Sequence, residues 1–314
     1  MPHRWSERST QLSCHVVIKR GMVSRAVLLL LCVGRVWAVS VGSAAAAWGT
    51  AIGAVHHLLE PPRTLRTSAA LEQLANTRIA GPDANDILAY VARPPAAPDG
   101  EELPVLVMIH EFFGLSDSIA AKARLFAKDL NCLVIAPDTF RGVTTSFIPQ
   151  AIWLALSTPQ DRVNRDLDAV IEWAGSAAGA DVTRVAVLGF CYGGGKAIRY
   201  TTQVRPGAAT VVYYGTPLTS SSDVASLRAP VCGVFGANDV QIPPPAVNAF
   251  RDALSEAQIE HEVVSYAGVG HAFFSDVRQV EREEMPVVAA YKQSTDFLRR
   301  FYSSGTAGTG EGGK

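Results

Sequence analysis

The sequence predicts an α/β fold with a mostly parallel sheet and helices on both of its faces. Short, continuous apolar runs such as Pro104–His110 and Cys132–Ala136 alternate with longer segments that have helical spacing. An apolar run of this length is typical of a strand that is buried on both faces. Strands that alternate with helices in this way form parallel pairs joined by helical crossovers.

Local signals bound each element in the first half of the body. Pro94 and Pro137 end two of the strands, because proline cannot donate a hydrogen bond to a strand ladder. Ser116 or Asp117 is the expected N-cap of the first helix. In chain order, the expected elements are strand 86–93, strand 104–110, helix 116–129, strand 132–136 and helix 161–178.

The same alternation continues in the second half. One helix begins with prolines, where a missing backbone N–H is harmless. The expected elements are strand 184–189, helix 193–203, strand 209–214, strand 230–235, helix 243–258, strand 260–266 and helix 283–302. No internal repeat or interdomain linker interrupts them, so one domain of catalytic size is predicted from residue 80 to 302.

Both flanks of this domain differ from it in composition. The tail 303–314 is rich in Gly, Ser and Thr and is expected to be flexible. Residues 1–75 are interpreted as a targeting leader that is removed. Residues 1–59 contain one acidic and six basic residues, and such an acid-poor, basic composition is typical of targeting segments.

Several interpretations of the leader remain open. Arg25 precedes the apolar run Ala26–Val33, which is the pattern of a signal peptide, and Met22 is a candidate start. Segment 61–68 then resembles a transit peptide, so plastid entry through a two-part leader stands beside secretion or an ER-lumenal location. The uncharged stretch 36–55 is long enough to span a bilayer as a retained anchor. The protein is therefore expected to be exported or organelle-targeted.

Composition and charge exclude several classes of protein. The 314 residues are 48% hydrophobic and 18% charged, which allows a sizeable core and rules out a mainly disordered chain. A net charge of -1 gives no reason to expect a nucleic-acid partner. Five widely spaced cysteines without a C-x-x-C pair fit neither a disulfide scaffold nor a zinc site. No dinucleotide fingerprint, P-loop or metal-ligand cluster calls for a cofactor or metal.

Segment 189–195 (GFCYGGG) has the form of a nucleophile elbow with Cys191 in place of serine. It lies between a predicted buried strand and a predicted helix. The nucleophile of an elbow sits on a strained turn, where glycines prevent flanking side chains from colliding with neighbouring backbone. The N-terminus of the following helix favours a thiolate and an oxyanion.

A nucleophile in this fold requires an acid and a histidine base, in the order nucleophile, acid, histidine. Asp239 follows the strand that ends at Phe235, and His271 follows the strand that ends at Tyr266. Loops at the carboxyl ends of strands carry the sites of open α/β sheets. The sequence therefore predicts a catalytic triad of Cys191, Asp239 and His271.

From about residue 86 to 301, the chain resembles the dienelactone hydrolase family of the α/β-hydrolase superfamily. The matching segments are 109–114 (IHEFFG), 136–138 (APD), 189–195 (GFCYGGG), 213–215 (YYG), 235–239 (FGAND) and 270–273 (GHAF). The resemblance implies the α/β-hydrolase fold. It also implies hydrolysis with Cys191 as nucleophile, His271 as base and Asp239 as the acid that orients the histidine.

The resemblance further implies roles for residues beside the triad. Glu111 would contact the thiol and control when it ionises, with a purely structural salt bridge as the alternative. The backbone N–H groups of Phe112 and Tyr192 would form the oxyanion hole. Phe113 and Phe273 would line the substrate pocket, unless they are ordinary core residues.

One position departs from the family pattern. Family members that act on dienelactone hold the substrate carboxylate with arginines, one of them four residues after the catalytic histidine. That position is Ser275 here, and Arg278 is the candidate replacement. Three further arginines lie in the variable region before the elbow: Arg141, Arg162 and Arg165. The resemblance therefore supports the fold and the triad better than it supports dienelactone as the substrate.

The leading functional hypothesis is hydrolysis of small esters or lactones through an acyl-enzyme on the Cys-His-Asp triad. The variants of this hypothesis are a thioesterase and a general carboxylesterase. The alternatives of another class are a non-catalytic relative that binds a small ligand, and a membrane interaction protein if the leader is retained. The expected partner is a small-molecule substrate and not nucleic acid, and the protein is expected to be a monomer.

Overall fold

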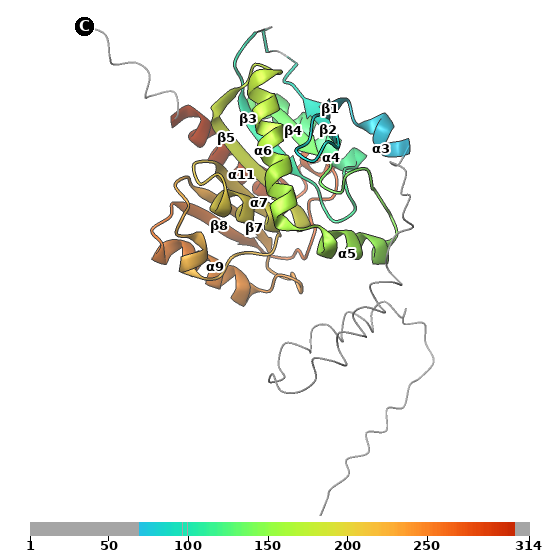
Figure 1. Cartoon of the computed structure of the whole chain (residues 1–314). Helices are drawn as coiled ribbons and strands as arrows, with labels where there is room; N and C mark the ends of the chain where they lie inside the picture. The colour runs from blue at the N-terminus through green and yellow to red at the C-terminus, as the bar shows by residue number, and fades with distance from the viewer. Residues whose placement is uncertain (1–68, 96, 99, 305–314) are drawn as a thin grey trace, which may run out of the picture. The chain divides into compact units, whose positions relative to one another are not determined.

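The structure is a computed structural model that describes residues 69–95, 97–98 and 100–304 (Figure 1). Most of the predicted leader and residues 305–314 lie outside this part of the chain. The signal peptide, the transit segment, the anchor and the tail therefore stay predictions. Within the described ranges, no helix is both long enough and apolar enough to cross a membrane.

Eight strands of the described chain form one sheet in the order β1-β2-β4-β3-β5-β6-β7-β8. β1 pairs with β2 and β2 with β4 in antiparallel fashion, and every neighbouring pair from β4 to β8 is parallel. The strands are β1 Thr77–Ile79, β2 Ile87–Ala92, β3 Pro104–Ile109, β4 Leu133–Pro137, β5 Asp181–Phe190, β6 Ala209–Tyr213, β7 Val231–Gly236 and β8 His261–Tyr266.

The central strands differ from the edge strand β8 in burial. β3, β4, β6 and β7 consist entirely of buried residues, as their continuous apolar runs predict. In β8, only Val263 is buried. Among the described strands, β8 pairs with β7 alone.

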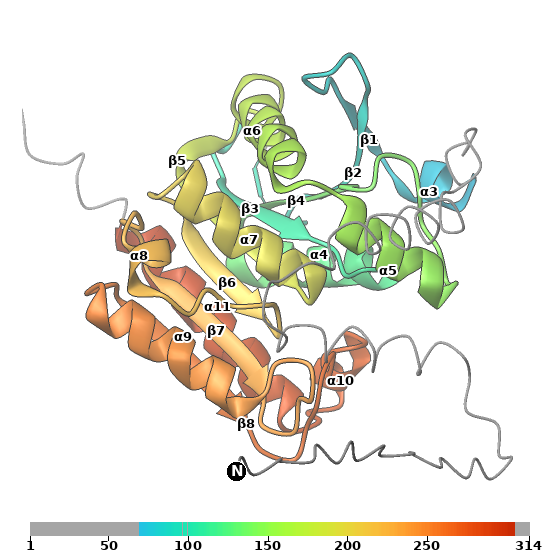
Figure 2. The ribbon, with the colours of Figure 1, turned by 60° about the horizontal axis from the view of Figure 1, so that its bottom comes forward.

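Helices cover both faces of the sheet. Side chains of α3, α4 and α11 share one core cluster with the strands, and those of α6, α7 and α9 pack on the opposite face (Figures 1 and 2). The predicted fold class is confirmed. The helices are α3 Ala69–Leu74, α4 Asp117–Leu130, α5 Ile148–Ser157, α6 Gln160–Ser176, α7 Tyr192–Gln203, α8 Ser221–Val224, α9 Pro244–Glu256, α10 Arg278–Glu281 and α11 Val287–Ser304.

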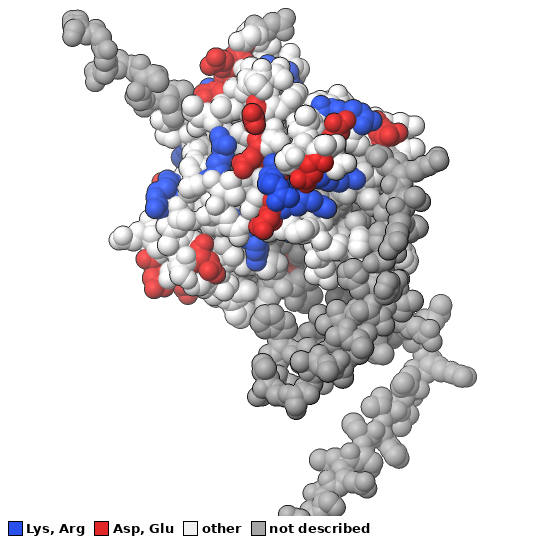
Figure 3. All heavy atoms as spheres, viewed as in Figure 1, with Lys and Arg blue, Asp and Glu red and all other residues white. Residues whose placement is uncertain are grey.

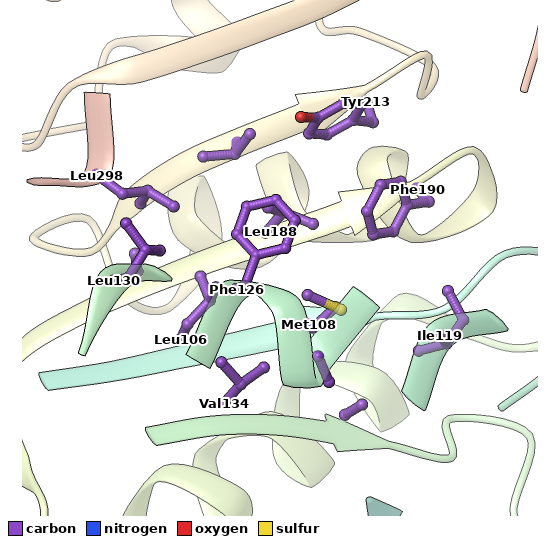
Figure 4. Close-up of a cluster of buried hydrophobic side chains, with 14 of the residues drawn as sticks. Leu106, Met108, Ile119, Phe126, Leu130, Val134, Leu188, Phe190, Tyr213 and Leu298 are labelled. Carbon is purple, nitrogen blue, oxygen red and sulfur yellow. The ribbon is translucent and has the colours of Figure 1, made fainter. Parts of the chain in front are cut away.

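The apolar residues of the central strands pack against α4 and α11 in one buried cluster. Phe126 of α4 belongs to one buried cluster with Leu106 of β3, Leu188 of β5 and Leu298 of α11 (Figure 4). All four side chains are fully buried. Burial of one such side chain contributes roughly 1.5–3 kcal/mol relative to exposure. This layer therefore fixes both helices on the strands that lead to the site.

Several short elements are absent from the sequence-based prediction. α8 and α10 have four residues each and β1 has three, which is too short for a periodic signal. α5 is apolar on its exposed side as well, since Leu156 is 82% exposed, so no amphipathic pattern marks it. The last helix begins at Val287 rather than 283, because Pro286 disfavours helical backbone at the residue before it.

The folded region begins before residue 80, which corrects the predicted boundary. Leu71 of α3 is only 1% exposed and belongs to the core cluster of α4 and α11. β1 adds a strand to the sheet beside β2. Residues 69–79 therefore pack with the domain.

Candidate active site

Cys191 occupies the sharp turn between β5 and α7. Its backbone has φ of 51° and ψ of -113°, a strained conformation for a residue with a side chain. A Cβ on Gly189 would lie 2.0 Å from the Gly193 carbonyl oxygen, and one on Gly193 would lie 2.3 Å from that of Ile109. These two glycines let α7 approach the sheet closely enough to form the strand-turn-helix geometry of an elbow.

The order of strands brings three loops together at the carboxyl ends of β5, β7 and β8. His271 Nε2 lies 3.0 Å from Cys191 Sγ. His271 Nδ1 lies 2.7 Å from Asp239 Oδ2. The three residues that the sequence singles out are therefore in direct contact, although 80 residues separate Cys191 from His271.

Backbone groups fix the orientation of Asp239, whose exposed fraction is 2%. Its Oδ1 accepts hydrogen bonds from the N–H groups of Gln241 at 2.7 Å and Ile242 at 3.0 Å. Oδ2 accepts a hydrogen bond from the Nδ1–H of His271. This arrangement favours the tautomer in which Nε2 is free to take a proton from the thiol.

The surroundings of Cys191 favour a protonated thiol at rest. Burial raises the pKa of the Cys191 thiol to about 12, and the negative charges of Glu111 and Asp239 act in the same direction. A hydrogen bond from the Tyr192 N–H opposes them. Efficient thiolate formation at neutral pH therefore requires a base, and His271 Nε2 is in contact with the sulfur.

The Glu111 carboxylate has two polar partners, Tyr214 and Lys122. Tyr214 Oη donates a hydrogen bond to Glu111 Oε1 at 3.4 Å, and Lys122 Nζ lies 3.9 Å from the same oxygen. Among the described residues, no hydrogen bond joins Glu111 to Cys191. Its charge raises the pKa of the Cys191 thiol, and the role in controlling the thiol that the resemblance implies stays a prediction.

Phe112 and Tyr192 directly follow Glu111 and Cys191, at the carboxyl ends of neighbouring strands β3 and β5. Both residues therefore lie at the carboxyl ends of the strands, where Cys191 also lies. Aromatic rings border the same region. The centroids of Phe112 and Phe113 are 4.1 Å apart, and Phe273 packs against Tyr214 at 5.6 Å.

The arginines considered for a substrate carboxylate have other partners. Arg278 is 66% exposed and pairs with Asp276. Arg141 forms two hydrogen bonds with buried Asp166. The remaining two bind elsewhere: Arg162 donates to the Thr139 carbonyl and Arg165 pairs with Asp83. No contact within the described chain joins these arginines to the triad. On the face of the molecule that Figure 3 shows, acidic and basic side chains are interspersed.

His110 and Asp138 organise the loops around the site. His110 Nδ1 lies 2.7 Å from the Glu111 carbonyl oxygen, and its Nε2 accepts a hydrogen bond from the Thr139 N–H. Burial lowers the pKa of His110 to about 4, so the ring is neutral at pH 7. Asp138 Oδ1 accepts from the Phe140 N–H. No group of three or more His, Cys, Asp or Glu in the described ranges is placed to hold a metal ion.

Two residues at the site have no role in the sequence-based prediction. Tyr214 has a positive φ of 40°, and Glu111 Oε1 and the Phe274 carbonyl oxygen share its single hydroxyl proton, at 3.4 and 3.2 Å from Oη. Lys122 is fully buried in the middle of α4. The available signal for Lys122 is its position on the apolar stripe of the helix, between Ile119 and Phe126, where a cation is unexpected.

A mostly parallel sheet with a nucleophile elbow, followed by an acid and a histidine after later strands, is the arrangement of an α/β-hydrolase. Within this class, the model of the dienelactone hydrolase family matches residues 87–302. The chain belongs to this family. It is therefore a hydrolase of the ester and lactone class.

Individual relatives agree with this placement. A Salmonella typhimurium protein named "Putative carboxymethylenebutenolidase" is 37% identical over 208 residues, which cover 62% of this chain and 76% of that protein. An Escherichia coli protein of the same name is 35% identical over 204 residues, covering 60% and 74%.

Solved structures show the same fold. A crystal structure from Klebsiella pneumoniae titled "Putative Dienelactone Hydrolase" has a TM-score of 0.63 and 30% identity, and covers 71% of this chain and 96% of that chain. A thermophilic esterase from Thermogutta terrifontis, 17% identical with a TM-score of 0.54 over 76% of this chain and 95% of its own, shares the fold alone.

Proposed function

We propose that the protein hydrolyses small esters or lactones with Cys191 as nucleophile, His271 as general base and Asp239 as the residue that orients the histidine. The observation that carries this proposal is the continuous chain of contacts from Cys191 Sγ to His271 Nε2 at 3.0 Å and from Nδ1 to Asp239 at 2.7 Å. The strained elbow presents the sulfur at the N-terminus of α7, where partial positive charge stabilises developing anions.

The proposed reaction has two halves. His271 Nε2 takes the proton of the Cys191 thiol, and the sulfur forms a bond to the substrate carbonyl carbon. The alkoxide leaves with the proton from His271, so a thioester acyl-enzyme remains. His271 then takes a proton from water, the hydroxide attacks the thioester carbon, and the C–S bond breaks. The proton returns to the sulfur and the acid product departs.

The oxyanion of each tetrahedral intermediate is proposed to lie between the backbone N–H groups of Phe112 and Tyr192. Both follow neighbouring strands, and the Tyr192 N–H already bonds to the sulfur. Each such donor contributes on the order of 3 kcal/mol to the transition state. Phe113 and Phe273 are proposed to border the acyl or alcohol group of the substrate.

We propose neutral esters and lactones rather than dienelactone as the preferred substrates. Ser275 replaces the arginine expected four residues after His271, and Arg278 is held by Asp276 at an exposed position. A thioesterase or a general carboxylesterase fits the same pattern. In either case the acyl-enzyme on Cys191 is the same.

Substrate turnover by the full chain tests the proposal, with p-nitrophenyl acetate, a neutral lactone, a dienelactone and an acyl thioester. Wild-type protein should hydrolyse one or more of the first two faster than dienelactone, and Cys191→Ala should abolish the activity. Mass spectrometry after a rapid acid quench should find the acyl group on Cys191. A folded wild-type protein that binds small ligands but turns over none would instead support the non-catalytic alternative.

We also propose that the leader directs the protein to export or to an organelle and is removed before α3. The basic, acid-poor composition of residues 1–59 supports this proposal. N-terminal sequencing of the protein from its own cells should find a start between residues 36 and 69. A mature chain that still begins at Met1 or Met22 and fractionates with membranes would support the retained anchor.

A further inference from the structure

Lys122 is a buried cation with no ordinary hydrogen-bond partner. It lies on the sheet-facing side of α4, and its exposed fraction is 0%. Among the described residues, its Nζ makes no hydrogen bond. Burying an ammonium group is costly unless an opposite charge compensates. The position therefore demands an explanation other than packing, because an uncharged side chain would fill the space at lower cost.

The groups around Lys122 belong to the three segments that form the candidate site. Its Nζ lies 3.9 Å from Glu111 Oε1, on the loop after β3. It lies 4.5 Å from the ring centroid of Phe190, the residue before Cys191, and 5.1 Å from that of Phe274, on the loop that carries His271. Aromatic faces attract cations, so one carboxylate and two rings enclose the ammonium.

Glu111 lies near both the Cys191 thiol and the Lys122 ammonium. Cys191 faces His271, Glu111, Asp239 and the hydroxyl of Tyr214. Lys122 faces Glu111 and, at longer range, Asp276. Burial lowers the pKa of Lys122, and both carboxylates oppose that effect. Asp276 is already paired with Arg278 at the surface, which leaves Glu111 as the carboxylate that Lys122 balances.

We propose that Lys122 is a positioning residue that neutralises and holds Glu111, so that the Cys191 thiolate forms beside a closed ion pair and not beside a free carboxylate. This inference rests on the proposed function of Cys191. With Lys122 present, the Glu111 carboxylate is held by the ammonium and the Tyr214 hydroxyl. Without Lys122, its charge would act uncompensated on the thiolate and its carboxylate would be free to turn toward it.

The test measures the rate at which iodoacetamide alkylates Cys191 in the full chain, at a fixed pH below the pKa of the thiol, together with ester turnover. The variants are Lys122→Met, Glu111→Gln and the double variant. Lys122→Met should slow alkylation about three- to tenfold. An uncompensated carboxylate nearby raises the pKa of the thiol by about one unit, which lowers the thiolate fraction about tenfold. The more basic thiolate is also more nucleophilic, which offsets part of this loss. The double variant should return the rate toward wild type, because the pair is then neutral again.

Lys128→Met is the matched control, since it makes the same change on an exposed position of α4. It should alkylate at the wild-type rate. Lys122→Met should unfold at a lower temperature than wild type, because it leaves the Glu111 carboxylate without its partner, and the double variant should recover that stability. If Lys122→Met is slowed but the double variant is slowed equally, the defect lies in packing and the assignment is overturned. An unchanged rate in Lys122→Met overturns it as well.

The same measurements separate this inference from the proposed function. Wild-type protein that shows Cys191-dependent ester turnover supports the triad whether or not Lys122 matters. Wild-type protein without such turnover overturns the proposed function, and the inference about Lys122 with it.

Discussion

At the scale of single residues, the two carboxylate oxygens of Asp239 have different hydrogen-bond partners and therefore different roles. Oδ1 is taken by the backbone N–H groups of Gln241 and Ile242, and Oδ2 by His271. The first task holds the loop and the second sets the histidine tautomer. A substitution that keeps the first and changes the second therefore separates stability from catalysis.

Asp239→Asn is that substitution. Its amide oxygen can accept the two backbone hydrogen bonds, while its NH₂ would face His271 Nδ1 and favour the tautomer that cannot deprotonate the thiol. We expect kcat/KM for p-nitrophenyl acetate to fall by about 10²- to 10⁴-fold, with a melting temperature within a few degrees of wild type. Retained activity would show that the histidine does not depend on Asp239.

The state of the thiol gives a pH prediction. Burial raises the pKa of Cys191 to about 12, so the thiolate fraction of the free protein should grow about tenfold per pH unit through the neutral and mildly alkaline range. The rate of Cys191 alkylation should rise with the same slope, as followed by intact-mass spectrometry. A plateau near neutral pH would mean that the resting residue is already a thiolate.

At the scale of elements, the close approach of α7 to the sheet depends on glycine. Gly193→Ala would place a Cβ 2.3 Å from the Ile109 carbonyl oxygen, which neither backbone segment can avoid without moving. We expect a loss of about 3 kcal/mol in the free energy of unfolding and loss of activity, because the elbow shifts. Gly207→Ala, which meets no atom within 4 Å, is the control and should unfold as wild type does.

The short helix α3 gives a second prediction at this scale. Leu71→Ala should lower the free energy of unfolding by about 2–4 kcal/mol, because Leu71 is buried in the core. Chemical denaturation measures the change. Leu156→Ala, at an 82% exposed position of α5, should change it by less than about 0.5 kcal/mol. Equal stability of wild type and Leu71→Ala would place the domain boundary after α3.

The elements that could be predicted are those with strong local signals. Continuous apolar runs mark β3, β4 and β7, and the spacing from Val163 to Ala174 marks α6. α3 and β1 could not be predicted, because six and three residues carry no period and only contacts distant in sequence hold them. The predicted leader, residues 1–75, therefore overlaps α3, which covers Ala69–Leu74.

The candidate site shows the same division. Cys191, Asp239 and His271 could be found because each lies after a strand and beside characteristic glycines. Lys122 and Tyr214 could not be assigned, because their relation to Glu111 exists only after α4 and β6 have packed. Arg278 is near His271 in sequence, yet local bonding to Asp276 decides where its side chain lies.

At the scale of the whole molecule, the three residues of the proposed triad follow strands that differ in their number of paired neighbours. Cys191 follows β5, in the middle of the sheet, and Asp239 follows β7, which has a neighbour on each side. His271 follows β8, which lies at the margin of the sheet and pairs with β7 alone among the strands of the described residues. Marginal strands open at lower free energy than central ones.

Heating should therefore inactivate the enzyme before it melts. We expect ester turnover to be lost, reversibly at first, several degrees below the midpoint of the far-ultraviolet circular dichroism transition, because departure of His271 suffices to stop the reaction. Hydrogen exchange should find β8 amides exchanging well before those of β5. The stability of the edge strand β8 then sets the temperature range in which the enzyme works. Mutations that stabilise β8 would extend that range without changing Cys191 or its surroundings.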